Sequence, residues 1–68
     1  MNEHTIGEVA GEVWVYLAKH GGQAEVTTIR NQVRAREGVS ADLGMGWLAR
    51  EGKLYFTPDH GTVQVFLR

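Results

Sequence analysis

The three histidines are the first residues to consider, because an imidazole can bind a metal ion or transfer a proton near neutral pH. His4, His20 and His60 are far apart in the sequence, none is four residues from another, and the chain has no cysteine. Asp59 stands beside His60, but both fall in a turn sequence, where aspartate is a common turn residue, and no nucleophile is adjacent. We therefore expect no metal, no cofactor, no catalytic residue and no enzymatic activity.

Phosphate binding is the second kind of chemistry that the residue types allow. The candidate nucleic-acid-binding residues are Arg30, Arg34, Arg36, Arg50 and Lys53. These five cations and three carboxylates give residues 26–53 a net charge of +2, whereas one lysine against four glutamates gives residues 1–25 a net charge of −3. The whole chain carries −1. Dedicated nucleic-acid-binding proteins are usually clearly basic, so we expect any binding of duplex DNA to be weak and salt-sensitive.

The first element that must position these residues is an amphipathic helix near the N-terminus. Thr5 and Glu8 match a capping box at its start, and His20-Gly21-Gly22 is typical of its end. Apolar residues recur between them with the helical period, which predicts that they face the core: Ile6, Val9, Ala10, Val13, Trp14, Tyr16 and Leu17. We expect Trp14 and Trp47, both on core-facing positions, to pack rather than to stack on bases.

Two further helices follow, and the joint between them looks tight. Thr27 or Thr28 is expected to cap a helix that buries Ile29 and Val33 and closes at Glu37-Gly38. Only Val39 then separates that helix from Ser40, which caps the next helix, and this helix ends at Gly52. The apolar positions of the last helix predict an inward stripe of Leu43, Gly44, Trp47 and Leu48 and an outward face of Asp42, Met45, Gly46 and Ala49. Two helices so closely joined indicate a helix-turn-helix.

The C-terminal residues predict a β-hairpin with strands at 53–56 and 63–67. If 58–61 is a four-residue loop, Phe56 pairs with Val63, Leu54 with Val65 and Tyr55 with Gln64. One face of this hairpin is wholly apolar, and a slip of one residue would mix the two faces. We also expect Val26 to pair as a minor third strand, because residues 23–26 are too few for a helix.

These elements define the expected fold class, α+β and mainly α. Residues 1–68 form a single winged helix-turn-helix domain, with three helices followed by a two-stranded β-hairpin wing and a short third strand near Val26. A core of 68 residues without disulfides only just offsets chain entropy, so a homodimer is expected. No apolar run reaches the roughly 18 residues that span a bilayer, and no export signal is visible, so we expect no membrane association and a cytoplasmic location.

Two strings in the chain are similar to a known family. They are Ile6-Gly7-Glu8-Val9-Ala10-Gly11, followed by Trp14, and Gly46-Trp47-Leu48-Ala49-Arg50-Glu51 with Lys53. They resemble a family of short bacterial and archaeal winged helix-turn-helix domains of unknown function, over nearly the whole chain. The resemblance implies a dimeric three-helix winged fold and no established activity. Gly44 departs from it, since a small helix-favouring residue is expected there.

Two functions are compatible with these observations. In the first, the protein is a DNA-binding regulatory module, with Arg50 as the one plausible base reader and the other four cations on phosphates. In the second, it is a homodimeric protein-interaction module without nucleic-acid binding, whose interface uses Met45, Ala49, Tyr55 and Phe66. Glycine at 44 and 46 costs about 1 kcal/mol each within a helix. Close approach of the helix backbone to Trp14 or to another chain would account for both glycines.

Overall fold

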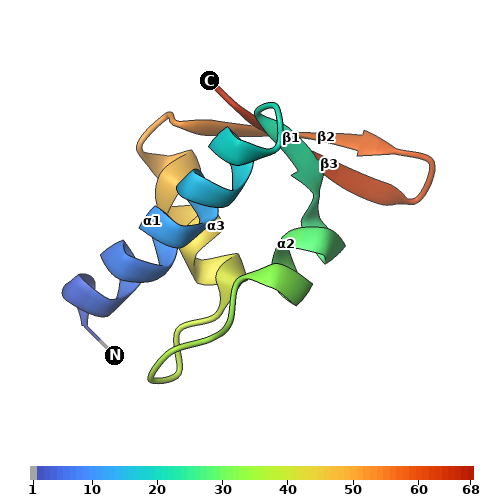
Figure 1. Cartoon of the computed structure of the whole chain (residues 1–68). Helices are drawn as coiled ribbons and strands as arrows, with labels where there is room; N and C mark the ends of the chain where they lie inside the picture. Colours follow the sequence, from blue (N-terminus) through green and yellow to red (C-terminus); the bar gives the residue numbers. More distant parts are fainter. Residues whose placement is uncertain (1) are drawn as a thin grey trace.

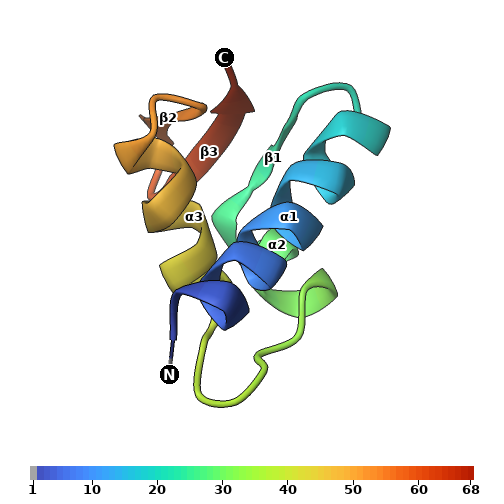
Figure 2. The same cartoon turned by 90° about the vertical axis from the view of Figure 1, so that its left-hand side faces the viewer.

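A computed structural model of the protein describes residues 2–68 (Figure 1). The elements in chain order are α1 (Glu3–Lys19), β1 (Gln23–Glu25), α2 (Val26–Gln32), α3 (Ala41–Arg50), β2 (Leu54–Asp59) and β3 (Thr62–Leu67). The strands form one antiparallel sheet in the order β1-β3-β2. Helices α1 and α3 cross beside one another at one side of this sheet (Figure 2). The fold therefore has the three expected helices, and the expected hairpin is extended by β1 to three strands.

Helix α1 begins earlier than its capping box predicts. Asn2 is the N-cap, and its Oδ1 accepts a hydrogen bond from the backbone nitrogen of Thr5 at 2.9 Å. Thr5 is buried within the first turn instead, and its hydroxyl donates to Oε2 of Glu37 at 2.8 Å. The cap at Thr5 is thus wrong, because a distant carboxylate satisfies this hydroxyl. The predicted end is confirmed: the helix stops at Lys19, and Gly21 takes a positive φ of 78°.

Helix α2 is shorter than predicted. It starts at Val26 with no side-chain cap, so the expected caps at Thr27 and Thr28 are wrong. The start is fixed by β1, which occupies the residues immediately before it and provides the expected third strand near Val26. Val26 itself, which was expected to pair, is the first residue of the helix instead. Ile29 is buried as expected, but the helix ends at Gln32.

The connection between α2 and α3 spans residues 33–40 and is not the tight joint that the sequence suggested. Val33 lies in this connection yet remains buried. Arg36 and Val39 exchange two backbone hydrogen bonds of 2.9 and 2.8 Å around a two-residue turn. Both turn residues, Glu37 and Gly38, have positive φ. The glycine therefore serves this turn rather than the end of a helix.

Helix α3 begins and ends as predicted, but it presents a different face to the core. The Ser40 hydroxyl oxygen accepts a hydrogen bond from the backbone nitrogen of Leu43, and Gly52 follows the helix with positive φ. The buried positions are Ala41, Gly44, Met45 and Leu48. Met45 is therefore a core residue and not an outward one, whereas Leu43 is 42% exposed.

The close approach of α1 explains this rotation of α3. A β-carbon on Gly44 would lie 2.9 Å from Cγ1 of Val9 and 3.1 Å from the backbone nitrogen of Ala10. The two helices meet where α3 has no side chain, so this position sets the centre of the buried stripe. A close approach had been expected for Gly44, but its partner is the Val9-Ala10 backbone rather than Trp14 or a second chain.

The hairpin pairs two residues out of the predicted register. Leu54 pairs with Leu67, Tyr55 with Phe66, and Phe56 with Val65. The turn contains only His60 and Gly61, at φ 50° and 85°, the positive values that a type I′ hairpin turn needs. Strand β2 consequently continues through Pro58 to Asp59.

The predicted faces survive this error, because a shift of two residues preserves the alternation of side chains. Pro58 is tolerated because β2 is an edge strand. The hairpin tip extends past α1 and α3 (Figure 1), and Phe56 and Val63, both on the apolar face, remain 41% and 39% exposed. The apolar face is therefore only partly covered.

The core lies between α1, α3 and the sheet. Its buried hydrophobic residues are Val9, Ala10, Val13, Leu17, Ile29, Val33, Val39, Ala41, Met45, Leu48, Leu54 and Val65. Trp47 is half-buried against this core, but Trp14 is 45% exposed, which corrects its expected place in the core. None of the helices described here combines the length and apolar character that crossing a bilayer requires.

Candidate nucleic-acid interface

The helix-turn-helix presents α3 and the end of α2 to solvent. The exposed positions of α3 are Asp42, Leu43, Gly46 and Arg50, with Trp47 half-buried beside them. Aspartate, leucine and glycine do not provide the donors that read base edges in the major groove, where arginine, lysine, asparagine and glutamine are the usual readers. Arg50, in the last turn, is the one side chain of this face that can donate to a base or a phosphate.

Arg30 is held by a carboxylate of the next helix. Its Nε donates to Oδ1 of Asp42 at 2.8 Å and its Nη2 donates to Oδ2 at 3.0 Å, a bidentate pair that joins α2 to α3. These hydrogen bonds hold the pKa of Asp42 below its ordinary value, and the carboxylate raises the pKa of Arg30. The guanidinium of Arg30, which was expected to bind phosphate, is thus already paired with the carboxylate of Asp42.

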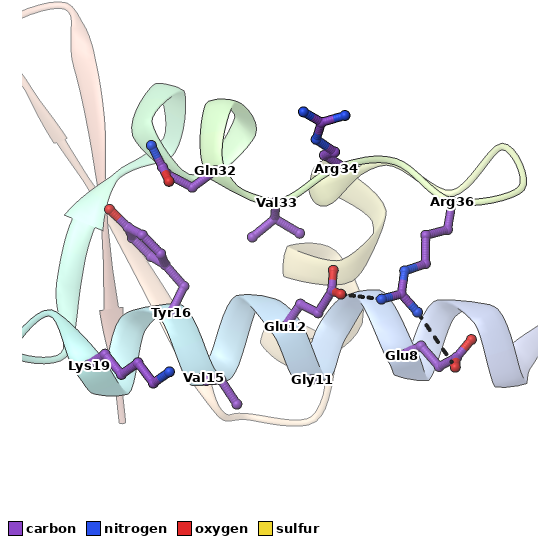
Figure 3. A pocket seen from close by; sticks show the side chains of 10 residues that line it. All are labelled: Glu8, Gly11, Glu12, Val15, Tyr16, Lys19, Gln32, Val33, Arg34 and Arg36. Atoms are coloured by element: carbon purple, nitrogen blue, oxygen red, sulfur yellow. Dashed lines mark hydrogen bonds and ion pairs between the residues drawn. The ribbon is translucent and has the colours of Figure 1, made fainter.

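Arg36 and Lys53 are also paired. The guanidinium of Arg36 reaches across to α1, where it donates to Glu12 and lies 3.6 Å from Oε2 of Glu8 (Figure 3). The ammonium of Lys53 lies 3.6 Å from Oε1 of Glu51. Arg36 therefore fastens the α2–α3 connection to the acidic first helix, and its positive charge is locally balanced.

Arg34 and Arg50 are the two candidate cations without such a partner. Across residues 2–68 neither takes part in an ion pair. Both are exposed, and the side chain of Arg34 points away from α1 (Figure 3). The structure therefore leaves free charge just after α2, where Arg34 lies in the α2–α3 connection, and in the last turn of α3, where Arg50 lies.

The tip of the wing adds no cation to this surface. Asp59, His60 and Gly61 form it, and Nε2 of His60 lies 3.7 Å from Oδ1 of Asp59. Within residues 2–68, no three histidine or carboxylate side chains come together in a group that could hold a metal ion. The wing tip is thus poorly suited to follow a phosphate backbone.

The four residues expected at a dimer interface do not share one exposed surface. Met45 lies in the core and Ala49 packs against it. Tyr55 and Phe66 lie opposite one another in the sheet, and their rings stack with centroids 5.0 Å apart. The guanidinium of Arg68 lies 5.0 Å from the centre of the Tyr55 ring. This role of Arg68 was not predictable from the sequence, because it depends on the hairpin register.

Two shallow grooves flank α1. The first, of about 680 Å³, lies between α1 and the segment that follows α2; Figure 3 shows Val33 pointing toward α1 and Arg36 bridging the groove to the α1 glutamates. The second, of about 590 Å³, lies between α1 and α3 and has Trp14 and Trp47 among its lining residues.

With this geometry established, comparison with known proteins identifies the family. The family model described as winged helix-turn-helix domain (DUF2582) matches residues 1–67. The chain belongs to this family. The family is of unknown function. Its match confirms the resemblance noted from the Gly46–Glu51 string. No curated protein and no solved structure matches the chain.

Proposed function

We propose that this winged helix-turn-helix domain is a regulatory module that binds duplex DNA weakly, through phosphates rather than bases. The observation that carries the proposal is the free charge of Arg34, in the connection just after α2, and of Arg50, in the last turn of α3. The exposed face of α3 has few base-reading side chains, so the binding has little sequence preference of its own.

The expected strength follows from the number of free cations. Each phosphate that is neutralised contributes about −0.9 to the slope of log K against log salt. Two arginines therefore give a slope of about −2, which lowers the affinity roughly tenfold between about 50 and 200 mM salt. Phosphates that compete successfully for Arg30, Arg36 or Lys53 would steepen this dependence.

Fluorescence anisotropy with a random-sequence duplex at low and moderate salt tests this proposal. Arg34→Ala and Arg50→Ala should each weaken binding at low salt and make the slope of log K against log salt shallower by about 0.9, the contribution of one phosphate. Lys19→Ala is the matched control, because Lys19 is an exposed cation on α1, which is not one of the two helices of the helix-turn-helix. Absence of binding at low salt, or an equal loss from Lys19→Ala, would refute the proposal.

A homodimeric interaction module is the second candidate function. It is supported by large apolar side chains that the monomer leaves 39–46% exposed: Trp14, Val15, Leu43, Tyr55, Phe56 and Val63. Of these, Phe56 and Val63 lie together on the apolar face of the hairpin, and clustered exposed apolar residues are typical of a surface that another protein covers. Light scattering over a range of protein concentrations tests this function, and a constant monomeric mass would exclude it.

A further inference from the structure

The first turn of α3 is poorly suited to read bases, although the N-terminal residues of the second helix normally contact base edges in a helix-turn-helix. The carboxylate of Asp42 could accept from a cytosine, but both of its oxygens already accept hydrogen bonds from Arg30. Leu43 beside it is apolar and exposed, and Gly46 has no side chain. Before its last turn, the exposed face of α3 therefore offers no unpaired hydrogen-bonding side chain to a base.

The exposed residues of α2 are of a different kind. Thr27, Arg30 and Asn31 all have side chains that donate hydrogen bonds, and they are three and four residues apart, so they share one side of the helix. The helix contains no carboxylate, and Ile29 is buried on its other side. The outward side of α2 is therefore polar and basic, as a surface that faces DNA requires.

Asn31 is the free donor on this side of α2. Arg30 is paired with Asp42, and the hydroxyl of Thr27 donates to Oε2 of Glu25 at 3.4 Å. Within residues 2–68, the side-chain amide of Asn31 takes part in no hydrogen bond. Its donor and its acceptor are thus both available to a ligand.

We propose that α2, rather than α3, meets the bases of a bound duplex, and that Asn31 contacts adenine in the major groove. The amide of asparagine matches the major-groove edge of adenine, because it can donate to N7 and accept from the N6 amino group. The inference rests on the proposed function, since it adds a base contact to the phosphate contacts of Arg34 and Arg50.

The length of α2 limits how much sequence it can read. Its seven residues extend about 10 Å at 1.5 Å per residue, which corresponds to about three base pairs and fits a major groove about 12 Å wide. A helix of this length with one free amide distinguishes a single A·T pair. This agrees with DNA binding that is weak and has little sequence preference.

Anisotropy titrations at low salt with two duplexes of equal length test the inference. One duplex contains only A·T pairs, and in the other 7-deazaadenine replaces every adenine, which keeps base pairing and phosphate charge but removes the N7 acceptor. The wild-type protein should bind the modified duplex about fivefold more weakly, the effect of one lost hydrogen bond. Asn31→Ala should bind both duplexes with equal affinity and keep the wild-type slope of log K against log salt.

Gln32→Ala is the matched control. Gln32 is the neighbouring exposed amide, but it lines the groove between α1 and the α2–α3 connection, so this variant should discriminate between the duplexes as the wild type does. Three results would overturn the inference and leave phosphate-driven binding intact: equal wild-type affinity for both duplexes, a preference that Asn31→Ala retains, or a preference that Gln32→Ala loses. Absence of binding to either duplex would overturn the proposed function as well.

Discussion

Two glycines in α3 should respond in opposite ways to the same substitution. Gly46→Ala places a methyl group where no atom lies within 4 Å, so the variant gains helix propensity without a steric cost. Stability should rise by about 1 kcal/mol, or about 4–8 °C in Tm for a domain of this size. Gly44→Ala gains the same propensity, but its methyl group would sit 2.9 Å from Cγ1 of Val9.

The steric cost at Gly44 should exceed its gain in propensity. The next nearest atoms to the new methyl group belong to the α1 backbone, at 3.1 Å (the nitrogen of Ala10) and 3.2 Å (the carbonyl carbon of Val9), so it cannot be accommodated by turning a flexible side chain. Overpacking of this kind costs about 1–3 kcal/mol. After subtraction of about 1 kcal/mol of propensity, Gly44→Ala should be destabilising by up to about 2 kcal/mol.

The difference between the two variants isolates the contact between α1 and α3, because their propensity terms cancel. It should amount to about 1–3 kcal/mol in the free energy of unfolding. Urea denaturation of both variants, followed by circular dichroism and extrapolated with a common m-value, measures it. If Gly44→Ala were as stabilising as Gly46→Ala, α1 would not lie against Gly44, and the orientation of α3 described above would be wrong.

Three further variants test other parts of the structure. Asp42→Asn should release Arg30 to bind a phosphate. In anisotropy titrations the affinity for duplex DNA at low salt should rise, and the slope of log K against log salt should steepen by about 0.9. An unchanged slope would show that Arg30 does not reach phosphate. The pKa of Asp42 is lowered in the folded state, so this carboxylate stabilises the fold at pH values above its ordinary pKa of about 3.9. That stabilisation is lost as the pH falls through the folded pKa, so Asp42→Asn should flatten the acid side of the stability–pH curve. Leu17→Ala removes a fully buried side chain and should cost about 2–5 kcal/mol by thermal unfolding, whereas a loss below 1 kcal/mol would contradict its place in the core. His60→Asn should raise the free energy of unfolding by up to about 1 kcal/mol, and with it the Tm, because asparagine favours the positive φ of a type I′ turn. A lower Tm would argue against a two-residue turn.

The end of α1 and both ends of α3 were predictable because their signals act within a few residues. Gly21 closes α1, Ser40 caps α3 and Gly52 follows it, each through its own backbone conformation or a hydrogen bond to a near neighbour. The two faces of the hairpin were also correct, since the alternation of side chains along a strand does not depend on the partner. Thr5 shows the limit of such signals, because its hydroxyl donates to the side chains of Asn2 and Glu37 and does not accept from the backbone of the first turn.

The candidate site was predictable only as a set of residue types. The sequence identified five cations in the middle of the chain, but not which of them carboxylates would occupy. Arg30 is paired with Asp42, and Arg36 with Glu12 and Glu8, across elements whose spacing depends on the α2–α3 connection. That connection is longer than the sequence suggested, since Gly38 belongs to a turn within it.

The sequence by itself determined that the chain forms three helices and a hairpin, because periodicity, capping residues and glycines specify local backbone structure. Tertiary packing alone decided which face of α3 is buried, since Gly44 meets the α1 backbone and draws Met45 inward while Leu43 and Trp14 are left exposed. It likewise decided the hairpin register, where the chain forms a two-residue turn at His60-Gly61 instead of the four-residue loop that the sequence also allowed. Choices of this kind depend on the shape of a partner surface, which exists only after the elements have packed.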